Sequence, residues 1–103
     1  MISNNIKDII PQIQHFFGSQ PIKRAWLFGS CSRGEETSSS DLDILVEYDR
    51  QKARISLMTI ANIMLSLEKI ISRKIDLVEF NCLLPFAKES AEKDKILIYE
   101  RKD

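Results

Sequence analysis

Apolar residues recur along the chain in a pattern that alternates between helical and strand-like spacing. Apolar positions three or four residues apart predict helices at residues 3–17, 51–72 and 85–93. Short apolar runs predict strands at residues 22–28, 41–48, 74–80 and 95–100, the last of them at an edge of the sheet. In the first strand, Trp26 and Phe28 alternate with Ala25 and Leu27, so both faces there are apolar, which is typical of a sheet covered by helices on its two faces.

This order of elements predicts one domain spanning residues 1–103. Its class is α/β (α+β), with a mixed β-sheet of about four strands flanked by helices. A chain of 103 residues can bury one core, whereas two domains of half that length would each have too little. A short helical turn capped by Ser30 is expected between the first two strands.

Pro11 interrupts the first predicted helix. Because an interior proline removes a backbone hydrogen bond, we expect the helix to kink or to restart near Pro11, and to end at Gly18. His15 lies in this helix with no metal-ligating residue three or four positions further on. A surface or boundary position is therefore expected for His15.

The longest predicted helix, residues 51–72, has an apolar stripe wider than one helix face. Burial against the sheet and a neighbouring helix would account for this width. A protein–protein interface around Met58 would also account for it, and the two explanations are compatible. The stripe leaves open a homodimer, a hetero-complex or both.

The composition narrows the possible partners and the compartment. Lys and Arg total 15, as do Asp and Glu, and no basic patch stands out, so direct nucleic-acid binding is not expected. No apolar run is long enough to span a membrane, and no signal-peptide pattern is seen. Cys31 and Cys82 lack metal-like spacing and are expected to stay reduced. These features predict a soluble protein of the cytoplasm.

The candidate chemistry lies in residues 27–48. Asp41 and Asp43 occupy alternate positions of a strand, so their side chains point the same way, roughly 6.5–7 Å apart along the backbone. Carboxylates placed in this way can bind one or two divalent cations from one face. Ahead of them, a Gly29-Ser30 turn opening into a helix offers backbone N–H groups to an anion. Carboxylates beside a phosphate cradle indicate nucleotide chemistry.

Ten residues separate Gly29-Ser30 from Asp41-Leu42-Asp43, and each motif adjoins a predicted strand. This combination resembles the signature of the DNA polymerase β-like nucleotidyltransferase superfamily. The flanking Leu27-Phe28, Arg33-Gly34-Glu35 and Ser40 sharpen the match. They resemble the minimal nucleotidyltransferases, which are often encoded beside a HEPN-domain protein as a toxin–antitoxin pair. The resemblance covers nearly the whole chain and implies the polymerase β-like nucleotidyltransferase fold.

The resemblance also implies roles for particular residues. Asp41 and Asp43 match the family's metal-binding pair. Asp76 matches its third acid, which completes a site for Mg²⁺, expected as two ions, and helps to deprotonate the attacking hydroxyl. Gly29, Ser30 and Arg33 are expected to hold the phosphates of ATP. The alternatives are a solvated carboxylate for Asp76, a helix N-cap for Ser30, and pairing with an acid such as Glu35 for Arg33.

By resemblance, the chain is an antitoxin that transfers AMP from ATP to a hydroxyl, expected to be a tyrosine, of a HEPN ribonuclease toxin. Two other functions remain open from the sequence. The chain could neutralise its partner by binding alone, for which the wide apolar helix is the argument. It could also be the nucleotidyltransferase subunit of an enzyme that modifies a small molecule.

Overall fold

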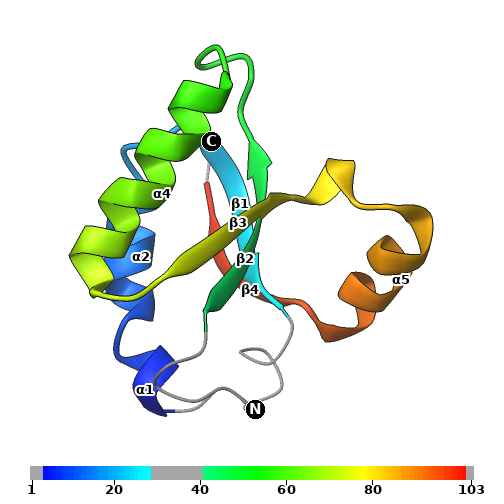
Figure 1. Ribbon diagram of the computed structural model, residues 1–103, viewed down its shortest axis with the longest axis horizontal. Coiled ribbons are helices and arrows are strands. Elements are labelled where there is room, and N and C mark those ends of the chain that lie inside the picture. Colours follow the sequence, from blue (N-terminus) through cyan, green and yellow to red (C-terminus); the bar gives the residue numbers. More distant parts are fainter. Residues whose placement is uncertain (1–3, 29–40, 102–103) are drawn as a thin grey trace.

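The computed structural model describes residues 4–28 and 41–101 (Figure 1). Its elements in chain order are α1 (Asn4–Lys7), α2 (Ile10–Phe17), β1 (Ile22–Leu27), β2 (Leu42–Tyr48), α4 (Leu57–Ile71), β3 (Ile75–Glu79), the 3₁₀ turn η1 (Phe80–Cys82), α5 (Pro85–Asp94) and β4 (Ile96–Glu100). The strands and α5 agree with the predicted ranges to within one residue at each end. The turn expected at Ser30 lies outside the described residues, and η1 was not predicted.

The four strands form one mixed sheet in the order β3-β2-β1-β4. β1 is antiparallel to both β2 and β4, whereas β2 is parallel to β3. β4 therefore lies at an edge of the sheet, as predicted. The connection from β2 to its parallel neighbour runs through α4, because parallel strands need a crossover rather than a tight turn.

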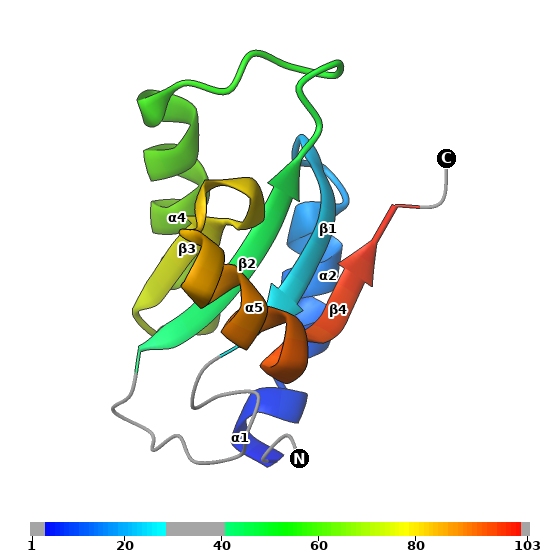
Figure 2. The ribbon, with the colours of Figure 1, turned by 90° about the vertical axis from the view of Figure 1, so that its right-hand side faces the viewer.

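Helices cover both faces of this sheet. α2 and α4 pack on one face and α5 lies across the other (Figures 1 and 2). Leu27, Ile44 and Leu67 belong to the core under α2 and α4, whereas Trp26 and Leu45 meet Ala91 of α5. Neighbouring residues of β1 and β2 thus enter different cores, which confirms the prediction that both faces are covered.

Pro11 restarts the N-terminal helix. α1 ends at Lys7 and α2 begins at Ile10, with the proline in its first turn, where the missing N–H costs no helical hydrogen bond. Gly18 ends α2, and its N–H donates to the carbonyl oxygen of Gln14 at 3.1 Å. Both predictions for this segment are confirmed.

The long helix begins later than predicted, at Leu57 instead of residue 51. The Asp49 carboxylate accepts the backbone N–H groups of Gln51 and Lys52, both at 3.2 Å, and so stabilises a turn where the helix was expected. Ser56 then caps α4 in a reciprocal capping box with Thr59. The hydrogen bonds of Asp49 and Ser56 thus keep residues 51–56 out of the helix, although the apolar spacing of these residues is helical.

The apolar stripe of α4 divides into a buried and an exposed part. Ile63, Leu67 and Ile71 are buried, whereas Leu57 is 86% exposed and Met58 is 70% exposed. Packing within this chain therefore explains only part of the stripe, and the proposed interface remains a prediction. Among residues 4–28 and 41–101, no helix has the length and apolar character needed to cross a membrane.

Two leucines of α4 provide a matched test of this division. Leu67 is fully buried, whereas Leu65, on the same helix, is 54% exposed. We expect Leu67→Ala to lower the free energy of unfolding by about 2–5 kcal/mol, because it removes transfer energy and leaves a cavity. Leu65→Ala should change it by about 0.5 kcal/mol or less. Urea denaturation followed by circular dichroism measures both values, and equal losses would contradict the assigned helix orientation.

Candidate active site

The pairing of β2 with β3 places two acidic residues side by side. Asp43 and Asp76 are direct partners in the parallel register, on strands that lie about 4.8 Å apart. On the same two strands, Leu42 and Ile44 pair with Ile75 and Leu77 and turn into the core under α2 and α4. The alternation therefore directs both carboxylates to the opposite face of the sheet, the one that α5 covers further along.

Asp41 directly precedes β2, two positions before Asp43. Backbone pairing continues at this end of the sheet, because the N–H of Leu42 donates to the carbonyl oxygen of Lys74 at 2.9 Å. Asp41 is exposed and Asp43 is half-buried. The three predicted acids thus gather at one end of the β2–β3 pair.

The pKa of the Asp43 carboxyl is sensitive to the two other acids, which lie close to it. Burial raises the pKa of the Asp43 carboxyl above its usual value of 3.8, and the negative charges of Asp76 and then Asp41 raise it further. The three carboxylates therefore repel one another when ionised. A bound cation would relieve that repulsion.

The chemistry of these donors suits a hard divalent cation. Mg²⁺ prefers oxygen ligands and commonly binds through one or two carboxylates together with water and substrate phosphates. Within residues 4–28 and 41–101, no three acidic, histidine or cysteine side chains are close enough to hold one ion between them. These residues therefore do not form a closed cage for a metal ion, and an ion bound to the carboxylates would need further oxygen ligands from water or a substrate.

Gly29, Ser30 and Arg33, the predicted phosphate-binding residues, lie outside the described residues. The residues that flank this segment are described. Phe28 donates its N–H to the carbonyl oxygen of Asp43 at 3.3 Å, and Asp41 follows the segment. The chain therefore leaves β1 and enters β2 at the end of the sheet that carries the acids (Figure 1). The phosphate-binding role of Gly29, Ser30 and Arg33 remains a prediction.

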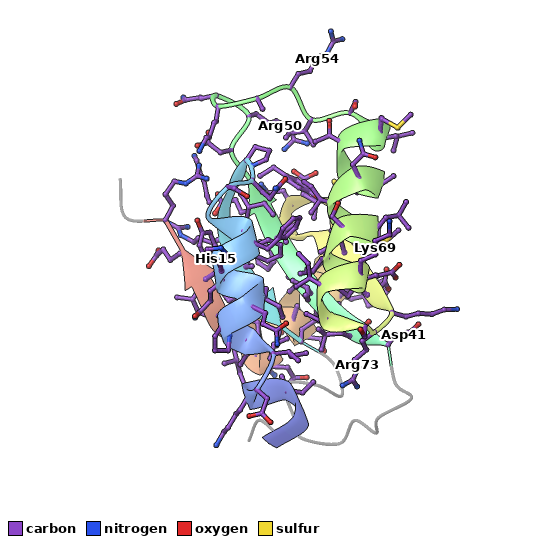
Figure 3. The ribbon with its side chains drawn as sticks, turned by 90° about the vertical axis from the view of Figure 1, so that its left-hand side faces the viewer. His15, Asp41, Arg50, Arg54, Lys69 and Arg73 are labelled. Carbon is purple, nitrogen blue, oxygen red and sulfur yellow. The ribbon has the colours of Figure 1, made fainter. Side chains whose placement is uncertain are left out.

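Arg73 was not singled out from the sequence. Ser72 ends α4 in a left-handed conformation (φ 55°), and the Glu68 carboxylate accepts the N–H of Ile75 at 2.9 Å. This turn holds Arg73 at the same end of the molecule as Asp41 (Figure 3). A half-buried cation near clustered acids is a second candidate for contacting phosphate. Its only signal in the sequence is its place just before the strand of Asp76.

The other charged clusters lie towards the opposite end of the sheet. Their side chains form ion pairs with one another, which accounts for their positions. Arg50 donates to both carboxylate oxygens of Glu79, and this hydrogen bonding lowers the pKa of the Glu79 carboxyl. Burial raises the pKa of Tyr48 to about 12, so its hydroxyl stays protonated at neutral pH. Arg101 pairs with Asp49 at 3.1 Å. His15 is exposed on α2, as predicted (Figure 3).

A family model and a curated relative both match most of this chain. The family model described as polymerase beta nucleotidyltransferase matches residues 11–103. A curated protein of Methanocaldococcus jannaschii, named "Putative protein adenylyltransferase MJ0435", is 33% identical over 85 residues, which are 82% of this chain and 88% of the relative.

Solved structures share the fold. One, described as "Structure of putative minimal nucleotidyltransferase", superimposes with a TM-score of 0.76 at 26% identity, covering 93% of this chain and 95% of the other. A chain from a complex of a tri-AMPylated Shewanella oneidensis HEPN toxin with an MNT antitoxin superimposes with a TM-score of 0.60 at 16% identity. That match covers 94% of this chain and 71% of the other. The predicted fold is confirmed.

The repulsion among the acids predicts a pH-dependent stability. Because the pKa of Asp43 is raised in the folded state, its ionised form destabilises the protein at neutral pH. We expect Asp43→Asn to raise the free energy of unfolding at pH 7 in metal-free buffer. The gain should shrink as the pH falls through the raised pKa and vanish below the ordinary value of 3.8. Urea denaturation across this pH range measures it.

Glu89→Gln is the matched control, since it also removes one negative charge but from an exposed position on α5. It should show a much smaller gain at pH 7. A loss of stability in Asp43→Asn at pH 7 would contradict the convergence of the three acids.

Proposed function

The chain belongs to the polymerase beta nucleotidyltransferase family, and on this premise we propose that it is a Mg²⁺-dependent protein adenylyltransferase that acts as an antitoxin. It would transfer AMP from ATP to a hydroxyl, which we propose to be a tyrosine, of a HEPN-domain toxin. The observation that carries this proposal is the β2–β3 register, which brings Asp43 beside Asp76 with Asp41 at the same end of the sheet. A relative of this chain is named as a putative protein adenylyltransferase, which supports the proposed activity.

The proposed reaction is an in-line attack on the α-phosphorus of ATP. The hydroxyl oxygen of the acceptor forms a bond to phosphorus, the bond to the β-phosphate oxygen breaks, and pyrophosphate leaves. Asp41, Asp43 and Asp76 would hold Mg²⁺, which supplies neutralisation of the phosphate charge. Asp76, the most exposed of the paired acids, would accept the proton of the hydroxyl.

The other site residues would position the nucleotide. Gly29 and Ser30 would offer backbone N–H groups and a hydroxyl to the β- and γ-phosphates, and Arg33 would neutralise their charge. These roles rest on family resemblance, together with the position of Phe28 beside Asp43. Since the phosphates and the acids must meet at one point, that position supports the assignment.

A HEPN partner is supported by the apolar surface of α4. Leu57, Met58 and Leu65 are large, exposed and on one helix, which is typical of a surface that another protein covers. One chain of the complex of a HEPN toxin with an MNT antitoxin shares this fold. The same surface favours a second candidate function, in which the chain neutralises a toxin by binding alone.

Transfer of label distinguishes these functions. With labelled ATP, Mg²⁺ and the protein encoded by the neighbouring gene, we expect label on that protein. Asp43→Asn should reduce the rate at least about 100-fold, because it removes charge stabilisation of the reacting phosphate. EDTA should stop transfer, and excess Mg²⁺ should restore it. Intact mass spectrometry of the partner measures the product as added AMP.

Glu47→Gln is the control, since Glu47 lies on the same strand and face as Asp43 but forms an exposed ion pair with Arg24. It should retain the wild-type rate within a few-fold. Transfer by Asp43→Asn at the wild-type rate would contradict the proposal. Full neutralisation of the toxin by Asp43→Asn, without any label, would favour neutralisation by binding alone.

A further inference from the structure

A groove of about 920 Å³ lies on the outer side of α2, and Ile70 of α4 forms its far wall. Its lining is mostly apolar. Pro11, His15 and Ser19 line it at intervals of four residues, which is the spacing of one helix face. The groove therefore follows α2 for about two turns, or about 12 Å. It belongs to the α2 and α4 side of the sheet, whereas Asp43 and Asp76 point to the α5 side.

The groove exposes apolar side chains that the core does not use. Ile70 is 44% exposed, although Leu67 and Ile71 on the same helix are buried. Phe16 is only half-buried, and Pro11 is exposed. α2 and α4 lie side by side here (Figures 1 and 3). An apolar strip between two neighbouring helices is suited to receive a third helix, whose side chains would fill it.

This groove is separate from the exposed surface formed by Leu57, Met58 and Leu65. Each residue of a helix turns it by about 100°, so Leu65 and Ile70, five positions apart, lie about 140° apart around α4. Met58 and Ile70, twelve positions apart, lie about 120° apart. A partner that covers Met58 and Leu65 would thus leave the groove open.

Few carboxylates are available beside the groove. α2 has no acidic residue, and α4 has only Glu68, whose carboxylate accepts the N–H of Ile75 at 2.9 Å. Asp8, before α2, adjoins the opposite charge of Lys7. Asp41 belongs to the acids at the end of the sheet. The chain has 15 basic and 15 acidic residues, so this shortage is a property of the surface and not of the whole protein.

Cations, in contrast, flank the groove. Lys69 adjoins Ile70, is exposed, and forms no ion pair with residues 4–28 or 41–101. Arg54 projects into solvent beyond the start of α4 (Figure 3). His15, exposed in the α2 wall, can donate a hydrogen bond to a carboxylate. The complementary surface is therefore apolar along its centre and acidic along its edges.

The described helices of this chain do not have that make-up. α2 has no acidic residue, and α4 carries Lys69 beside its one acid. α5 mixes Lys88 and Lys93 with its acids. A second copy of this chain is thus a poor match for the groove, and a different protein is the better one.

We propose that the groove between α2 and α4 binds an amphipathic helix of another protein. The apolar stripe of that helix contacts Phe16 and Ile70, and Asp and Glu on its flanks face Lys69 and His15. The groove needs neither nucleotide nor Mg²⁺ for this role, so the inference goes beyond the proposed function.

Selection from a library of displayed helical peptides, with the full chain as bait, tests the groove. The peptides are about 18 residues long, or five turns, and every face is randomised. We expect the enriched peptides to carry apolar residues three or four apart, with Asp and Glu on the flanks. Fluorescence anisotropy of a labelled enriched peptide then measures its affinity for the chain and for each variant.

Two substitutions in the chain separate the apolar and the charged contributions. Ile70→Glu should weaken peptide binding about tenfold or more, because it places a charge on the apolar strip. Lys69→Glu should weaken it about fivefold, because an attraction becomes a repulsion. A second peptide with Lys in place of each flanking Asp and Glu should prefer the Lys69→Glu variant to the wild-type chain.

Each substitution has a matched control on the other face of the sheet. Leu97→Glu changes an apolar residue of similar exposure, 48%, on β4. Its strand partner Trp26 packs against α5, so it does not meet the groove. Lys93→Glu reverses an exposed charge on α5. Both controls should leave peptide affinity unchanged, and circular dichroism verifies that every variant is folded.

The inference is overturned if the selection yields no helical peptide, or if the enriched peptides lack acidic flanks. Peptide binding that Ile70→Glu leaves unchanged, or that Leu97→Glu weakens equally, overturns it as well. Sedimentation equilibrium tests the remaining occupant. A dimer of the wild-type chain that Ile70→Glu dissociates would show that a second copy fills the groove, and the proposal of another protein would be wrong.

Discussion

The parallel pairing of β2 with β3 is the constraint on which the rest of the site depends. A strand that slips by one residue turns every side chain to the other face, so the register decides whether the acids meet. Leu42 and Ile44 pair with Ile75 and Leu77, and their burial under α2 and α4 makes a slip costly. The apolar face of the sheet therefore holds Asp43 beside Asp76 on the other face.

The turn before β3 strengthens the same constraint. Glu68, near the end of α4, accepts the N–H of Ile75, while the N–H of Leu42 donates to the carbonyl oxygen of Lys74. At the far end of the strands, Arg50 pairs with Glu79. Both ends of the β2–β3 pair are thus held by polar contacts that leave the acids on the α5 face. The fold tolerates repulsion at one end because packing and ion pairs elsewhere offset it.

The two layers of helices have different tasks. α2 and α4 supply most of the buried core, and α4 also presents Leu57 and Met58 to solvent. α5 covers less of the sheet and buries only Ala91 of its own residues, which leaves a cavity between it and the end of β1. One side of the sheet thus provides most of the buried core and an exposed apolar surface on α4, while the other side carries the paired acids Asp43 and Asp76.

The sequence by itself determined the features that depend on local spacing. Alternation in residues 41–48 predicted a strand with Asp41 and Asp43 on one side, Pro11 predicted a restarted helix, and resemblance assigned Asp76 as the third acid. Each of these follows from backbone geometry within a few residues, or from a motif that spans a short stretch. The family itself was identified in this way and is confirmed.

Only the tertiary structure decided the features that depend on distant residues. The register that places Asp76 beside Asp43 is set by apolar packing between two strands separated by α4. The predicted start of α4 was wrong by six residues. Asp49 and Ser56 form side-chain hydrogen bonds there, and apolar spacing does not reveal them. The cavity joins Phe28 to Phe86 across a long stretch of chain, and no local pattern connects them. Local chemistry selects the groups, whereas packing decides which of them meet.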